Sequence, residues 1–168
     1  MKGGAFTALW NDVINHAKVD QCIENEEGWW NRVVLEDNGK RLVAITVCRI
    51  VDANTKSVNS TKAQHERKTG KVKRAKEIRK EMLTKLKEEI RATKACDVLV
   101  VGGMNEDINS NSVQQFMVEF GLCDVFGELN EVEERNKEAT HEHGPKHIDF
   151  SLGTEGVMSI VDGTELMG

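Results

Sequence analysis

The sequence predicts a layered α/β domain in which a mixed sheet carries helices on its outside. Residues 41–51 (RLVAITVCRIV) are rich in Val and Ile, which is typical of a central strand. Residues 71–94 repeat apolar side chains at spacings of three and four, as an amphipathic helix does. Residues 97–101 (DVLVV) form a second short apolar strand, which two glycines end. A chain of 168 residues suits one such domain.

The first predicted element is a β-hairpin. Residues 29–35 carry aromatic and β-branched side chains, and the triplet Asp37-Asn38-Gly39 that follows them is a strong turn signal. Because residues 41–51 are almost all apolar, we expect this second strand in the middle of the sheet with both faces covered. A short mixed segment, residues 4–10, is compatible with a further strand.

A long polar segment and a long helix follow the hairpin. Residues 52–70 are rich in Asn, Ser, Thr and Lys and are predicted to be a loop. The helix over 71–94 has one apolar stripe, made of Val72, Ala75, Ile78, Met82, Leu86 and Ile90. The elements expected after residue 101 are a helix capped within 109–112 and ending near 120, a strand over 122–126, an acidic connector over 128–137, a strand over 146–152 and a short helix over 154–160.

The charge is distributed unevenly along the chain, whose net charge is −5. Residues 62–80 hold nine Lys/Arg and two acids, whereas residues 120–168 hold eleven acids and three Lys/Arg. A basic block of this kind can bind phosphate backbones, or it can be a solvated loop that runs into a helix with a charged outer face. Its candidate phosphate or nucleic-acid contacts are Arg67, Lys68, Lys71, Lys73 and Arg74.

The composition also excludes several classes of protein. No stretch approaches the ~20 apolar residues that a membrane span requires, and the N-terminus has no apolar segment of signal-peptide length. The cysteines, at positions 22, 48, 96 and 123, form no CxxC pair, which disfavours a structural zinc site made of cysteines. We therefore expect free thiols and an intracellular location, nuclear or cytoplasmic.

Polar residues suited to catalysis or ligand binding follow the strand over 97–101. In VVGGMNEDIN, Asn105 is a candidate donor to a phosphate oxygen, and Glu106 or Asp107 is a candidate ligand of a divalent cation. The ends of buried strands are where α/β folds place active sites. The alternative is an ordinary turn, because Gly, Asn and Asp are turn formers.

A second cluster lies in THEHGPKHIDF, residues 140–150. His141, His143 and His147 are candidate metal ligands, and Asp149 is placed to orient a histidine or accept a proton. The alternative is an exposed loop with solvated histidines. Cys48, inside the apolar strand, is expected to be a small buried filler.

Several of these segments resemble the endonuclease/exonuclease/phosphatase family. VLVVGGMNEDIN is similar to the family's Gly-Asp-x-Asn strand end, and KHIDFSL is similar to its (Arg/Lys)-x-Ile-Asp-(Tyr/Phe) strand. GGAFTALW, the Trp-rich strand and LVAITVCRI resemble its central strands, above all those of the endonuclease-like domains of retroelement proteins. The resemblance implies a four-layer α/β sandwich and Mg²⁺-dependent cleavage of phosphodiester or phosphomonoester bonds.

The resemblance also assigns roles to individual residues. Asn105 matches the motif Asn that contacts the scissile phosphate, Asp149 matches the strand Asp that supports a catalytic His, and Thr140 matches the Thr ahead of that strand. Asn105 and Asp149 are therefore the candidate catalytic residues, and they are expected to lie close together at one end of the sheet. Mg²⁺ is the implied cofactor.

Three departures from the family pattern bear on activity. Gly103 stands where the family has a catalytic Asp, Cys48 where the retroelement domains have Tyr, and His141 where an aromatic residue follows the Thr. Two family motifs, an early strand with a metal-binding Glu and a terminal Ser-Asp-His, do not occur within residues 1–168. We expect a truncated or catalytically impaired copy without appreciable nuclease activity. The alternative is a remnant that binds nucleic acid weakly or a metal through its histidines.

Overall fold

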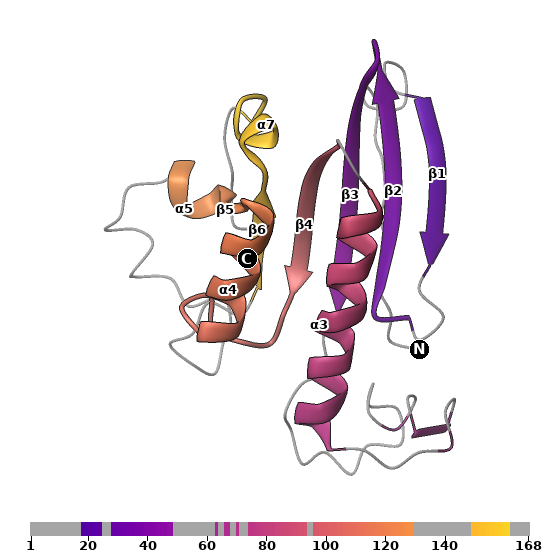
Figure 1. Ribbon diagram of the computed structural model, residues 1–168, viewed down its shortest axis with the longest axis vertical. Helices are drawn as coiled ribbons and strands as arrows, with labels where there is room; N and C mark the ends of the chain where they lie inside the picture. The colour runs from indigo at the N-terminus through magenta and orange to yellow at the C-terminus, as the bar shows by residue number, and fades with distance from the viewer. Residues whose placement is uncertain are drawn as a thin grey trace.

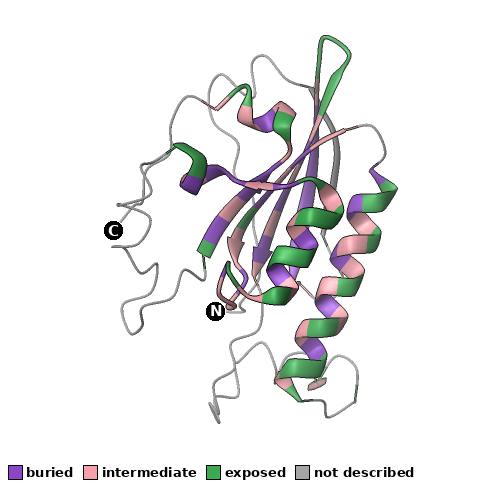
Figure 2. Cartoon of the chain, turned by 60° about the vertical axis from the view of Figure 1, so that its left-hand side comes forward, coloured by how far each residue is buried: buried purple, intermediate pink, exposed green. Residues whose placement is uncertain are grey.

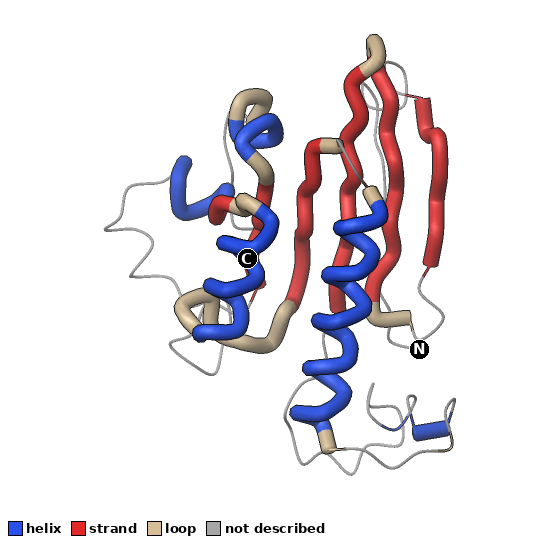
Figure 3. Tube along the Cα trace, in the orientation of Figure 1, coloured by secondary structure: helices blue, strands red, loops and turns tan. Residues whose placement is uncertain are grey.

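The computed structural model contains a six-stranded mixed sheet with the strand order β1-β2-β3-β4-β6-β5 (Figure 1). It describes residues 18–24, 28–48, 63, 66–67, 70, 74–93, 96–129 and 149–161. Helices α3 and α4 lie side by side against one face of this sheet, as the tube and the turned cartoon both show (Figures 2 and 3). No helix in these described ranges combines the length and the apolarity that crossing a membrane requires.

The N-terminal half of the sheet is an antiparallel meander. It consists of β1 (Lys18–Glu24), β2 (Trp30–Asp37) and β3 (Lys40–Cys48). Asn38 and Gly39 join β2 to β3 with φ of 49° and 77°, the left-handed conformation that a tight two-residue hairpin requires. The predicted hairpin is thus confirmed. Strand β1 was not expected from the sequence, and the strand expected over 4–10 lies outside the described residues.

The C-terminal half of the sheet is built around β4 (Asp97–Gly103). β4 pairs in parallel with β3, and β6 (Asp149–Gly153) pairs antiparallel with β4. The two apolar strands of the sequence are therefore central neighbours in the sheet. The strand expected over 122–126 is wrong in extent, because β5 covers only Cys123–Asp124 and the chain then turns into the short helix α5 (Val125–Leu129).

Two helices close one face of the sheet. α3 (Ala75–Ala92) buries Ile78, Met82, Leu86 and Ile90 of the predicted apolar stripe, while Ala75 is partly buried and Val72 lies outside the described residues. α4 (Asn111–Phe120) buries Val113 and Phe116 in the same core cluster. The N-cap of α4 is Ser110, whose hydroxyl accepts from the backbone N–H of Val113. The last helix, α7, covers Glu155–Met158 within the range expected for a short C-terminal helix.

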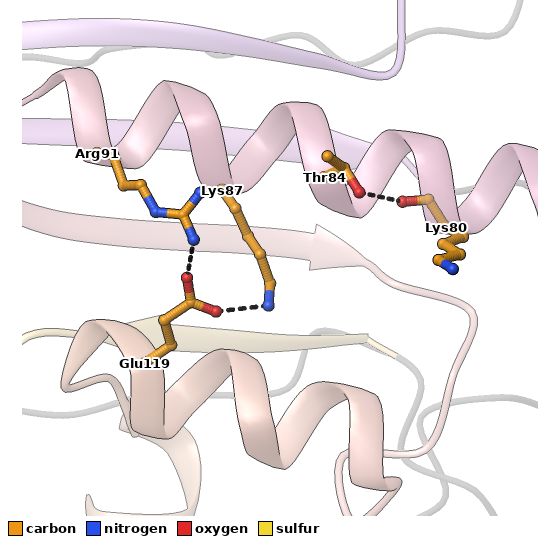
Figure 4. A network of polar contacts seen from close by, with 5 residues as sticks. All are labelled: Lys80, Thr84, Lys87, Arg91 and Glu119. Carbon is orange, nitrogen blue, oxygen red and sulfur yellow. Dashed lines mark hydrogen bonds and ion pairs between the residues drawn. The ribbon is translucent and has the colours of Figure 1, made fainter.

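Ion pairs complement this apolar packing. Arg32 of β2 forms an ion pair with Glu89 of α3, between the sheet and the helix. Between the two helices, Glu119 of α4 accepts from Lys87 Nζ at 2.6 Å and from Arg91, both on α3 (Figure 4). The hydrogen bond from Lys87 is the largest cause that lowers the pKa of Glu119. These pairs join α3 to β2 and to α4 in addition to the buried apolar contacts of the helix.

Burial of β3 differs between its two faces. Val43, Ile45 and Val47 are almost fully buried toward the helices, whereas the alternate residues, from Leu42 to Cys48, are only half-buried. Our expectation that both faces of this strand are covered is therefore wrong for the described structure. An apolar run does not by itself distinguish a strand covered on two faces from one covered on a single face.

Candidate functional site

Three strands bring their ends together at one corner of the sheet. Cys48 at the end of β3 is the register partner of Gly103 at the end of β4, and Gly103 is the partner of Asp149 at the start of β6. Because Gly103 has no side chain, the Asp149 side chain extends over it. A Cβ built on Gly103 would lie 2.7 Å from Asp149 Oδ1 and 3.9 Å from Asn105 Nδ2. The structure thus brings Asn105 and Asp149 together around Gly103.

The two adjacent glycines of β4 differ in how strictly the fold requires glycine at their positions. Gly102 has φ +125°, and a Cβ there would lie 2.3 Å from the carbonyl oxygen of Val47 in β3, so both its conformation and its space require glycine. Gly103 does not share this conformation, and an added Cβ would meet mainly the mobile end of the Asp149 side chain. Glycine at 103 is therefore not imposed by the fold.

Asn105 adopts a left-handed backbone conformation with φ 49°. Asn tolerates this region better than other non-glycine residues, but non-glycine residues held there cluster at functional sites. The preceding residue, Met104, is 1% exposed and anchors the turn in the core. The buried anchor and the left-handed turn together place the Asn105 amide beside Gly103.

Cys48 is half-buried rather than the buried filler that we expected. Burial, and then the negative charge of Asp149, raise the pKa of the Cys48 thiol. Both effects disfavour the thiolate, so Cys48 stays protonated at neutral pH and is unsuited to act as a base. The pairing of Cys48 with Asp149 across Gly103 was not anticipated, because it depends on strand register.

Glu106 and Asp107, the predicted cation ligands, participate in the structure of the loop. Glu106 accepts a hydrogen bond from the Ser112 hydroxyl, and Asp107 Oδ1 accepts from the backbone N–H of Asn109 at 2.9 Å. Within the described ranges there is no group of three or more His, Cys, Asp or Glu that could hold a metal ion. Their role as metal ligands stays a prediction from the sequence.

Several predicted site residues fall outside the described part of the chain. These are Thr140, His141, His143, His147, Lys68, Lys71 and Lys73. Of the predicted basic contacts that are described, Arg67 and Arg74 are both exposed, and Arg67 Nε donates to the carbonyl of Ala63 at 3.2 Å.

Comparison with known proteins identifies the fold. No protein-family model and no curated protein matches the chain. Among solved structures, the human Nocturnin catalytic domain with bound sulfate superposes with a TM-score of 0.51 at 10% identity, over 84% of this chain and 50% of that one. The chain has an endonuclease/exonuclease/phosphatase-type fold. Its α/β mixed sheet agrees with the predicted fold class.

Other solved structures of this fold type match with lower TM-scores. An endonuclease/exonuclease/phosphatase family protein from Bacteroides thetaiotaomicron gives 0.44 at 12% identity, over 84% of this chain and 53% of that one. A Staphylococcus aureus beta toxin with bound magnesium ions gives 0.43 at 16% identity, over 82% and 43%. The chain spans about half the length of the solved structures that it matches.

The family resemblance of the sequence motifs implies Mg²⁺, and the described corner suits this ion only in part. It offers the carboxylate of Asp149 and the amide of Asn105. Mg²⁺ is commonly bound through one or two carboxylates together with water and the phosphate groups of a substrate. The donor set therefore fits Mg²⁺ when a bound phosphoester contributes oxygens of its own.

The two glycines yield the first prediction. Gly102→Ala should lower the free energy of unfolding by about 2–4 kcal/mol. Alanine is strained in this backbone conformation, and its Cβ would clash with the carbonyl of Val47. Gly103→Ala should cost less than about 1 kcal/mol, because the Asp149 side chain can turn away. Urea unfolding of both variants measures the difference, and equal losses would show that Gly103 is as constrained as Gly102.

The second prediction concerns thiol reactivity. Asp149→Asn removes a negative charge beside Cys48, so the thiol pKa should fall and alkylation by iodoacetamide at pH 8 should become faster. Burial still raises the pKa in the variant, so Cys48 should remain a slow thiol. Peptide mass mapping follows each cysteine, and Cys123 is the internal control whose rate should not change. An unaltered Cys48 rate would mean that the carboxylate does not act on the thiol.

Proposed function

We propose that this chain is a nuclease- or phosphoesterase-like domain that binds a phosphoester at the Asn105/Asp149 corner and has largely lost the ability to cleave it. The observation that carries the proposal is the convergence of Asn105 and Asp149 on Gly103 in a fold of this type. Gly103 stands where the family resemblance expects an acid, and the acid nearest to it belongs to the neighbouring strand.

Binding follows from the chemistry of the two side chains. The Asn105 amide is able to donate a hydrogen bond to a phosphate oxygen, which is worth about 1.5–3 kcal/mol when the acceptor is charged. The Asp149 carboxylate repels a phosphate unless a divalent cation lies between the two anions. Mg²⁺ supplies that neutralisation when bound and polarises the phosphoryl group. The sulfate bound to the Nocturnin catalytic domain is a tetrahedral anion of the same kind, which supports an anion site in this fold.

Impaired cleavage follows from the absence of a suitable base at the described corner. Hydrolysis requires a group that orients or deprotonates the attacking water, and the loss of such a group typically lowers the rate by about 10²–10⁴-fold. Gly103 has no side chain, and the Cys48 thiol has a raised pKa that keeps it protonated. Asp149 would have to serve as both cation ligand and base, which are conflicting roles for one carboxylate.

A second candidate function is non-catalytic nucleic-acid binding, which the basic stretch over 62–80 favours. A relation to retroelement endonucleases stays a prediction from the sequence motifs. Metal binding through His141, His143 and His147 also stays a prediction, since these residues lie outside the described ranges.

The third prediction tests the phosphoester site directly. With Mg²⁺ present, a phosphodiester-linked dinucleotide should bind to the wild-type chain, and Asn105→Gly should weaken binding by about tenfold or more. Glycine retains the left-handed backbone at this position, so the variant removes the amide without adding strain. Calorimetric titration with and without Mg²⁺ measures the effect. Asp149→Asn should reduce the Mg²⁺ dependence of binding.

Plasmid nicking provides the complementary measurement. Wild-type activity should stay near background with Mg²⁺ or Mn²⁺. Robust nicking that both Asn105→Gly and Asp149→Asn abolish would contradict the proposed impairment. Dinucleotide binding that is insensitive to both variants would instead contradict the location of the site.

A further inference from the structure

The cations of α3 fall into two groups with different surroundings. In the C-terminal half of the helix they have partners within the protein. Lys85 Nζ lies 5.3 Å from the centroid of the Trp29 ring, and Lys87 and Arg91 both pair with Glu119 of α4 (Figure 4). Glu119 partly neutralises Lys87 and Arg91, and the three contacts hold α3 against Trp29, which precedes β2, and against α4.

The N-terminal half of α3 is different. Arg79 in this half is half-buried and interacts within the protein, whereas Arg74, Lys76 and Lys80 are exposed and, among the described residues, none of their charged groups has a partner. The backbone carbonyl of Lys80 accepts from the Thr84 hydroxyl, and Figure 4 draws no contact for the Lys80 ammonium group. The acid of the first turn, Glu77, accepts from the backbone N–H of Arg74 at 2.9 Å and so serves as a helix cap.

These cations lie at the same end of the molecule as the Asn105/Asp149 corner. α3 ends at Ala92, only a few residues before β4 begins at Asp97, and the two elements run in opposite directions (Figure 1). The first turn of α3 therefore lies at the end of the sheet where β4 finishes at Gly103 (Figure 1). The positive end of the helix dipole points to that side as well. One end of the molecule thus combines a phosphoester site with unpaired positive charge.

The ligand that fits this arrangement is a polyanion rather than a small phosphoester. A single phosphate at the corner is neutralised locally, and exposed cations on a neighbouring element add little to its binding. A chain with several phosphates can occupy the corner and contact the helix at once. The chain as a whole has a net charge of −5, so attraction of a polyanion must come from such a local surface.

Building on the proposed function, we propose that the N-terminal half of α3 is a docking surface for the phosphodiester backbone of a nucleic acid. Arg74, Lys76 and Lys80 contact backbone phosphates on one side of the phosphate held at the Asn105/Asp149 corner. The contacts are to phosphates alone, so binding depends on salt and is insensitive to base sequence.

The fourth prediction compares a double lysine variant of α3 with a single lysine variant elsewhere, by fluorescence anisotropy with a labelled single-stranded DNA of about 12 nucleotides. The double variant Lys76→Gln/Lys80→Gln should bind about tenfold more weakly at low salt. Its log–log salt slope should be shallower by about 1.4, or about 0.7 for each lost phosphate contact on a single strand. Lys40→Gln is the control, because Lys40 is an exposed lysine beside the hairpin turn at the opposite end of the sheet.

The outcomes separate this proposal from the proposed function. Lys76→Gln/Lys80→Gln should leave Mg²⁺-dependent dinucleotide binding unchanged, whereas Asn105→Gly should weaken it. Equal binding of the DNA by the double variant and by Lys40→Gln would overturn the docking surface while the corner site stands. Competition by polyglutamate as strong as that by unlabelled DNA would also overturn it, because the surface would then recognise negative charge in general. An RNA strand of equal length tests whether the sugar matters, and DNA and RNA should bind alike.

Discussion

The close approach of β4 to β3 at Gly102 is the constraint on which the rest of the site depends. With no Cβ at Gly102, the β4 backbone lies against the carbonyl of Val47, so the parallel pairing continues to the last residue of both strands. That pairing places Cys48 beside Gly103, and the pairing of β4 with β6 places Asp149 on the other side of Gly103. The buried Met104 then anchors the turn that carries Asn105.

Under the proposed function, the alignment of Cys48, Gly103 and Asp149 also explains why the corner would bind a phosphoester better than it would cleave it. Because Gly103 has no side chain, holding a cation and activating water would both fall to the carboxylate of Asp149. The negative charge of Asp149 also raises the thiol pKa of Cys48, after the larger effect of burial. The exposed cations on the first half of α3 lie at the same end of the molecule, and in our proposal they would extend the binding surface beyond the corner.

Local patterns in the sequence predicted the central features of the fold but not their relations in space. The Val/Ile runs, the DNG turn and the stripe of α3 specified the hairpin, two central strands and the long helix. Strand β1 (KVDQCIE) lacks a clean alternation and pairs with β2 through an irregular register between Val19 and Gln21, so no local signal marked it. The motif residues Asn105 and Asp149 were recognisable, whereas the position of Asp149 over Gly103 follows from strand register, which no short motif encodes.

The most direct test of the central claim is to place a carboxylate at position 103. In Gly103→Asp the side chain of Asp149 has to turn away from the new Cβ, which leaves two acids beside Asn105. The fifth prediction is that this variant nicks plasmid DNA with Mg²⁺ at least about tenfold faster than the wild-type chain, since a missing group of this kind is worth about 10²–10⁴-fold. Adding Asn105→Gly should abolish the gain. If Gly103→Asp is folded, as its urea midpoint would show, and is no faster than the wild type, the account of Gly103 is contradicted.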